Sequence, residues 1–154
     1  YHWFPKMYGR MMNKYLGYLH FWGTFICAYG VFFPMHFLGL AGLPRRYYNN
    51  ESFSMFDGLS DINAVITFFA LAGAVIQTIF LFNFFYSIFK GTKSSQNPWK
   101  ANTLEWTTPI ERIHGNWPGD IPEVHRWPYD YSKPGADDDF IQQNIPLKPG
   151  ESEH

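Results

Sequence analysis

The chain has 154 residues, of which 46% are hydrophobic and 21% aromatic, and its formal net charge is -1. The length is that of one domain, but the aromatic content exceeds that of an ordinary soluble domain. The sequence has no basic patch that could follow a phosphate backbone, so we expect no nucleic-acid partner. Cys27 is the single cysteine, and an internal disulfide is therefore excluded.

Residues 1–15 mix aromatic rings with cations. This mixture is typical of a membrane interface, where amphipathic rings lie at headgroup level and cations favour the cytoplasmic side; a plain surface loop is the alternative. The residues concerned are Trp3, Lys6, Tyr8, Arg10, Lys14 and Tyr15. Because the sequence opens at Tyr1 without a charged leader, we expect a piece of a larger polypeptide, or one that lost its upstream part, rather than a secreted protein.

Residues 16–43 form an uncharged run of 28 residues. As a helix this run would be about 42 Å long, which exceeds the roughly 30 Å hydrocarbon core of a bilayer. We predict one transmembrane helix over 16–43, with its regular part ending between Pro34 and Leu38 and with Gly39, Gly42 and Pro44 breaking it. Small residues within a span let a neighbouring helix approach closely. Those in this run are Gly17, Gly23 and Gly30.

Two histidines, His20 and His36, lie within this first span. Intramembrane histidines are candidate functional residues because a polar group in lipid needs a partner. We expect each to hydrogen-bond to a neighbouring group and neither to bind a metal.

A loop over 44–61 separates the first span from a second uncharged run over 62–89, which we predict to be another transmembrane helix. The loop carries Arg45 and Arg46, and it contains a glycosylation pattern at 50–52 that we expect to be unused. The amides of the second span should face partner helices, because lipid offers them no hydrogen bond. They are Asn63, Gln77 and Asn83.

The distribution of basic residues predicts the orientation of the hairpin. Six cations flank its two open ends and only Arg45 and Arg46 lie at its bend, so we place both ends in the cytoplasm and the bend in the periplasm or its equivalent. The six are Lys6, Arg10, Lys14, Lys90, Lys93 and Lys100.

The tail over 90–154 is polar, rich in proline and glycine, and contains recurrent tryptophans. Its aromatics are too frequent for a free linker, so we expect an extended cytoplasmic strap that frays after about Asp137. The acidic run Asp137 to Asp139 is interpreted as a solvated surface rather than a cation site. The tail histidines lack metal-ligand spacing and are assigned no role; they are His114, His125 and His154.

Three long stretches carry a resemblance to a known family. They are Tyr1-His-Trp-Phe-Pro-Lys-Met7 with Gly9-Arg10, Phe32-Phe-Pro-Met-His-Phe-Leu-Gly-Leu-Ala-Gly-Leu-Pro-Arg-Arg-Tyr47, and Asn97-Pro-Trp-Lys-Ala-Asn-Thr-Leu-Glu-Trp106. In order and spacing the chain resembles the C-terminal portion of subunit I of a haem-copper terminal oxidase, of the bacterial cytochrome c oxidase type. The resemblance implies an all-α membrane protein made of the last two helices of a twelve-helix-type bundle, followed by an irregular cytoplasmic tail.

The resemblance also implies what the double arginine does. Adjacent guanidinium groups at a membrane boundary need an anion, and the charge pattern alone leaves haem propionates, lipid phosphate and the loop's own acids open. By family position, Arg45 and Arg46 bind haem propionates and Phe32 packs against the haem a ring. No catalytic residue and no metal ligand is expected in this chain, because the family's haem and copper ligands come from upstream helices.

The implied enzyme is a proton-translocating cytochrome c oxidase of a bacterial inner membrane, of which this piece is a non-autonomous part. Its implied cofactors are haem a, a second high-spin haem and copper. The implied partners are the remainder of subunit I, subunits II and III, cytochrome c or an equivalent donor, and membrane lipid. The alternatives are a non-catalytic small membrane subunit and another haem-copper enzyme such as nitric oxide reductase. The sequence departs from the family's usual pattern at Met35, at 48–53 and at 107–115.

Overall fold

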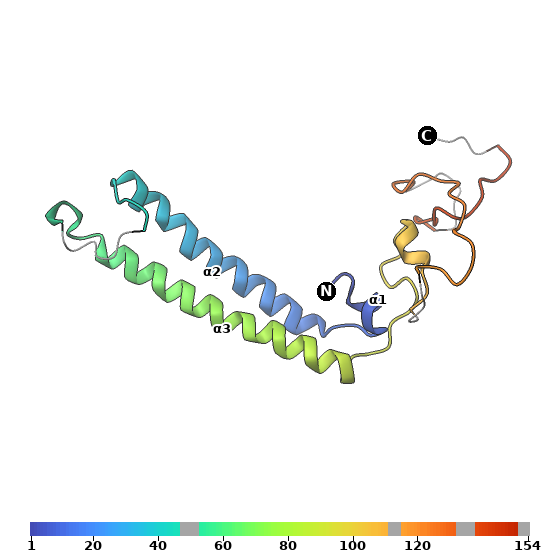
Figure 1. The fold of residues 1–154 in the computed structure, drawn as a ribbon, viewed down its shortest axis with the longest axis horizontal. Helices are drawn as coiled ribbons and strands as arrows, with labels where there is room; N and C mark the ends of the chain where they lie inside the picture. The colour runs from blue at the N-terminus through green and yellow to red at the C-terminus, as the bar shows by residue number, and fades with distance from the viewer. Residues whose placement is uncertain (47–52, 111–114, 132–137, 151–154) are drawn as a thin grey trace. The chain divides into compact units, whose positions relative to one another are not determined.

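A computed structural model describes residues 1–46, 53–110, 115–131 and 138–150. Its elements in chain order are α1 (Phe4–Tyr8), α2 (Lys14–Leu40), η1 (Ser54–Phe56), α3 (Ser60–Lys90) and η2 (Leu104–Thr107) (Figure 1). The described residues contain only isolated bridges and no strand. The glycosylation pattern at 50–52, His114, Asp137 and His154 lie outside the described residues. The predicted helical class with an irregular tail is confirmed.

The structure divides into two units. One consists of Asn13–Phe89 and contains α2 and α3; the other combines Tyr1–Met12 with Lys90–His154. Both long helices are long and apolar enough to cross a membrane. At about 1.5 Å per residue, the 31 residues of α3 exceed a bilayer core, so its ends reach the interface.

The helices α2 and α3 form an antiparallel hairpin and lie side by side (Figure 1). Glycines on the facing sides permit the contact. A Cβ atom at Gly23 would come within 2.7 Å of the Ile76 side chain, and one at Gly30 would overlap the ring of Phe69. The close approach predicted for these two glycines is therefore confirmed, and their neighbour is the other helix of the same hairpin.

Polar side chains lock the same contact. His20 Nε2 lies 3.1 Å from Gln77 Oε1, and Gln77 Nε2 donates to Thr24 Oγ1 at 3.0 Å. The side-chain amide of Gln77 thus finds its hydrogen-bond partners on α2, as expected for a polar group in a span. The prediction that His20 hydrogen-bonds to a neighbour is also confirmed.

The start of α2 depends on a residue from the far end of α3. The side chain of Asn13 caps α2 by accepting from the amides of Tyr15 and Leu16. The backbone of Asn13 is held in turn by Asn83, whose side chain accepts from its N–H and donates to its carbonyl, both at 3.0 Å. Asn83 is fully buried and also accepts from Ser87 Oγ at 3.1 Å.

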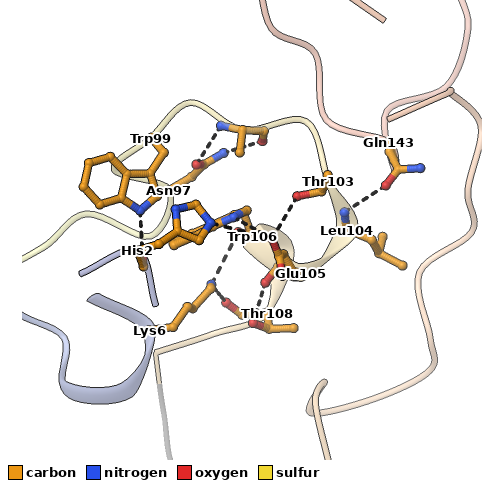
Figure 2. A network of polar contacts seen from close by, with 11 residues as sticks. His2, Lys6, Asn97, Trp99, Thr103, Leu104, Glu105, Trp106, Thr108 and Gln143 are labelled. Carbon is orange, nitrogen blue, oxygen red and sulfur yellow. Dashed lines mark hydrogen bonds and ion pairs between the residues drawn. The ribbon is translucent and has the colours of Figure 1, made fainter. Parts of the chain in front are cut away.

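In the other unit, the segment before α2 is fastened to the start of the tail. The backbone pairs Met11 N–H with the Thr92 carbonyl and Ser94 N–H with the Gly9 carbonyl. Figure 2 shows Lys6 reaching the carbonyls of η2. Its ammonium donates to Trp106 O at 3.4 Å and also to Thr108 O.

Trp106 is the centre of this network and is fully buried. The ring of His2 stands edge-on to it at 5.0 Å and stacks on Trp99 at 5.8 Å (Figure 2). The Lys6 ammonium lies 5.5 Å from the Trp106 ring, a cation–π distance. Burial lowers the pKa of Lys6, and the nearby Glu105 carboxylate partly opposes this.

The expected fraying of the tail is not what the structure shows for 138–150. Arg126 is almost fully buried and donates through Nε to Ile145 O at 2.8 Å and through its second guanidinium nitrogen to Pro146 O at 3.0 Å. It also pairs with the buried Asp130 at 3.4 Å. Because one guanidinium satisfies several backbone carbonyls at once, it holds this segment in place. Asp138 is exposed and lies 3.7 Å from the ammonium of Lys100.

Candidate functional site

The chain reverses just after α2, and this turn places the arginine pair. The helix passes Pro34 without breaking and ends at Leu40, slightly beyond the predicted Pro34 to Leu38. The N–H of Leu43 donates to the carbonyl of Leu38 at 3.0 Å, and Gly42 has a φ of 83°. A positive φ is readily adopted by glycine, so Gly42 permits the bend that carries the chain back beside the helix end.

A hollow of about 950 Å³ lies at this bend. It contains all three residues predicted as cofactor-binding: Phe32 from α2, and Arg45 and Arg46 from the segment that follows. The full lining is Phe32, Met35, His36, Leu38, Gly39, Leu40, Leu43, Pro44, Arg45, Arg46 and Asn63. The fold therefore gathers the predicted residues into one concave place.

The two arginines are exposed, and among the described residues no group forms a hydrogen bond or ion pair with either side chain. Arg10 and Arg126 differ, because their guanidinium groups donate to backbone carbonyls. Arg46 also has a φ of 66°, which is uncommon for a residue with a side chain. The hollow thus contains two adjacent planar donor forks, each suited to a carboxylate or a phosphate.

The rest of the lining is mostly apolar, and Phe32 is 64% exposed toward open space. A site of this size with apolar walls and a few convergent polar groups is typical of a cofactor pocket. A large flat apolar ligand with carboxylate groups fits both parts of the lining. The donors match the carboxylates, and the aromatic and aliphatic side chains match the ring.

The family model "Cytochrome C and Quinol oxidase polypeptide I" matches residues 1–73. The chain is 51% identical over 152 residues, 97% of its length, to "Alternative cytochrome c oxidase subunit 1" of Bradyrhizobium diazoefficiens. It is 47% identical over 133 residues to "Cytochrome c oxidase subunit 1" of Synechocystis, and 41% identical over 150 residues to that of Thermostichus vulcanus.

The chain matches a portion of cytochrome c oxidase subunit I. It covers 26%, 23% and 26% of these three relatives, in the order given, and so spans about a quarter of their length. The predicted resemblance is confirmed. By their names these relatives are subunit 1 of an oxidase, and the two long apolar helices of this chain are consistent with a membrane protein.

Two further residues belong to the hollow without having been predicted as site residues. His36 was expected to hydrogen-bond to a neighbour, which is confirmed by a 3.0 Å contact between its Nδ1 and the Phe32 carbonyl. Asn63 was expected to face a partner helix, and it lines the hollow from α3. Sequence spacing could have indicated His36 as a site residue, because it follows Phe32 by four residues and so lies on the same side of the helix.

Within the described residues, no group of three or more His, Cys, Asp or Glu side chains is close enough to hold a metal ion. His125 has a carboxylate neighbour, Glu123, at 3.6 Å. One carboxylate near one imidazole does not make a metal site.

Proposed function

We propose that the chain is the C-terminal portion of the catalytic subunit of a respiratory cytochrome c oxidase and that it binds and packs haem. The observation that carries the proposal is the common hollow of Arg45, Arg46 and Phe32. The whole enzyme would reduce O2 to water with electrons from cytochrome c or an equivalent donor and would pump protons. In this proposal haem a and the high-spin haem are shared with the rest of subunit I, and copper is bound by upstream residues.

Arg45 and Arg46 would bind the haem propionates. Each charge-assisted hydrogen bond of this kind contributes about 1.5–3 kcal/mol. Paired forks also fix the direction of the carboxylates, because a guanidinium binds a carboxylate through two parallel bonds. Phe32 would pack against the ring of haem a. The bound haem supplies electron transfer; the residues of this chain supply position and charge.

The arginines would also set the reduction potential. A fixed positive charge beside a haem favours the form with the added electron, so it raises the potential. The effect is larger in a site of low dielectric than in water. The hollow's apolar walls provide such a setting.

We propose that the hairpin lies in a bacterial inner membrane with both ends in the cytoplasm, because six cations flank its open ends and two lie at its bend. The proposed division is an interfacial lead-in over 1–15, spans over 16–43 and 62–89, a periplasmic loop over 44–61 and a cytoplasmic tail over 90–154. The partners would be the remainder of subunit I, subunits II and III, and membrane lipid. The identity of 51% over 97% of the chain to an oxidase subunit I supports this reading over a non-catalytic small subunit or a nitric oxide reductase.

The test is a set of variants in the assembled oxidase. Spectroelectrochemical titration should give a lower haem a midpoint for Arg45→Ala, because a positive charge is lost. Arg45→Lys keeps the charge without the planar guanidinium group, and its haem a midpoint should lie between those of Arg45→Ala and the wild type. Met35→Leu, in the same hollow, is the uncharged control and should leave the midpoint unchanged. An Arg45→Ala midpoint equal to or above the wild type would count against the proposed role.

A further inference from the structure

Lys14 is the first residue of α2, and its side chain is exposed. Its ammonium lies 5.8 Å from the centre of the Tyr18 ring, one turn further along the helix. This is a cation–π distance, and the spacing of four residues places the two side chains on one side of α2. Tyr15 and Tyr18 are 82% and 54% exposed. The start of α2 therefore presents one cation and two tyrosine rings to its surroundings.

The charge of Lys14 is not neutralised by the part of the chain that the structure describes. No carboxylate there forms an ion pair with its ammonium, and the first turn of α2 contains no acidic residue. Two other cations of the first 15 residues, Lys6 and Arg10, donate instead to backbone carbonyls. The ammonium of Lys14 has no such acceptor among the described residues, so its charge is open to an external anion.

The position of these side chains along α2 indicates the kind of anion. The 27 residues of α2 extend for about 40 Å, whereas the hydrocarbon core of a bilayer is roughly 30 Å thick. In the proposed span, the first turn of α2 thus lies among the lipid headgroups, where tyrosine is enriched. The side chains exposed just beyond it are apolar, namely Leu19, Phe21 and Trp22. A ligand that contacts both levels needs a negatively charged head and an apolar chain.

We infer that Lys14, Tyr15 and Tyr18 form a binding site for the phosphate of an anionic phospholipid. The inference rests on the proposed function, because it uses the span proposed for α2. The Lys14 ammonium binds the phosphate as a point charge, and a tyrosine hydroxyl can donate a further hydrogen bond. A zwitterionic lipid binds less well, because the cation of its headgroup repels the ammonium of Lys14.

The experiment uses the assembled oxidase in detergent and a phosphatidylglycerol that carries a photoactivatable diazirine in its headgroup. After irradiation, mass spectrometry of the digested protein identifies the labelled segments. The start of α2 should be labelled in the wild type and about fivefold less in Lys14→Gln, because one cation near an anionic lipid surface contributes about this factor. Lys14→Arg keeps the charge and should keep the labelling. A phosphatidylcholine with the same diazirine should label the wild type more weakly than the phosphatidylglycerol does.

Lys93→Gln is the matched control, because Lys93 is exposed and its ammonium lies over no aromatic ring of the described residues. It removes the same charge and should leave the labelling at the start of α2 unchanged. Equal labelling of the wild type and Lys14→Gln, or no labelling of either, overturns the inference. Loss of the label on adding inorganic phosphate at constant ionic strength also overturns it, because the site would then bind a free anion. The haem a midpoint of Arg45→Ala reports separately on the proposed function.

Discussion

Replacing Asn83 with leucine tests whether α3 holds the start of α2. Leucine has the same number and branching of side-chain heavy atoms as asparagine, so the change removes hydrogen bonds without opening a cavity. The change removes at least three bonds, namely two to the backbone of Asn13 at 3.0 Å each and one from Ser87 at 3.1 Å. The carbonyl of Asn13 keeps its bond from Gly17, whereas its N–H is left without the Asn83 acceptor.

The structure gives the size of the effect. Interhelical hydrogen bonds in membranes average about 0.6 kcal/mol, so three bonds set a lower limit of about 2 kcal/mol. An unsatisfied buried donor costs about 1–3 kcal/mol. The hydroxyl of Ser87 is fully buried and loses its acceptor, so the second cost applies in addition to the lost bonds. We therefore expect Asn83→Leu to lower the free energy of unfolding by about 3–5 kcal/mol.

The assay is a titration of the chain in detergent micelles with SDS, in which helix content is followed by circular dichroism. Thr67→Val is the control, because Thr67 is exposed and its hydroxyl donates within α3 to the carbonyl of Asn63. That control should change the unfolding free energy by less than about 0.5 kcal/mol. Equal small effects for the two variants would refute the reasoning, because the start of α2 would then be independent of α3.

Two further predictions concern the packing of the hairpin and the titration of the other unit. A Cβ at Gly73 would lie 3.3 Å from the Cβ of Cys27, close to the spacing of about 3.5–4.5 Å in disulfides. Oxidation of the Gly73→Cys variant should therefore form a disulfide between α2 and α3, so that the two helices stay joined after the loop is cleaved and separate only on reduction. The Gly39→Cys variant, with nothing within 4 Å of its Cβ, should form no such bond. Burial lowers the pKa of Lys6 below its ordinary value of 10.5, so the unfolded chain binds more protons and stability should rise with pH up to 10.5. The difference in unfolding free energy between wild type and Lys6→Met, measured at pH 7 and at pH 10, tests this, and a smaller stability of the wild type relative to Lys6→Met at pH 10 than at pH 7 would contradict it.

The two membrane helices could be predicted because absence of charge over a long run is a strong signal. Their mutual packing could be predicted only in part. Gly23 and Gly30 indicated close approach, but a helix that is apolar all round has no periodic pattern that tells which side faces its partner. The partners Ile76 and Phe69 therefore appeared only with the structure.

The fastening of the tail could not be predicted, because it depends on single residues far apart in sequence. Arg126 looked like any other charge in a polar segment, yet it is buried and donates to Ile145 and Pro146. A buried arginine is recognised by the carbonyl groups arranged around its guanidinium group, and these are visible only in the structure, not in the composition of the sequence. The network around Trp106 is similar, since its contacts come from His2 and Lys6, about a hundred residues earlier.

For the candidate site, the residues could be predicted but their arrangement could not. Arg45, Arg46 and Phe32 were predicted from a resemblance, while their meeting in one hollow depends on the turn through Gly42. In the proposed orientation the bend lies on the side of the membrane where cations are disfavoured. Two guanidinium groups there, exposed and unbonded among the described residues, need a compensating anion. A lipid could supply a phosphate with flexible acyl chains, and the loop's own acids could supply a carboxylate, whereas a haem combines carboxylates with one rigid flat ring and so matches the paired guanidinium groups and the aromatic wall at Phe32 together.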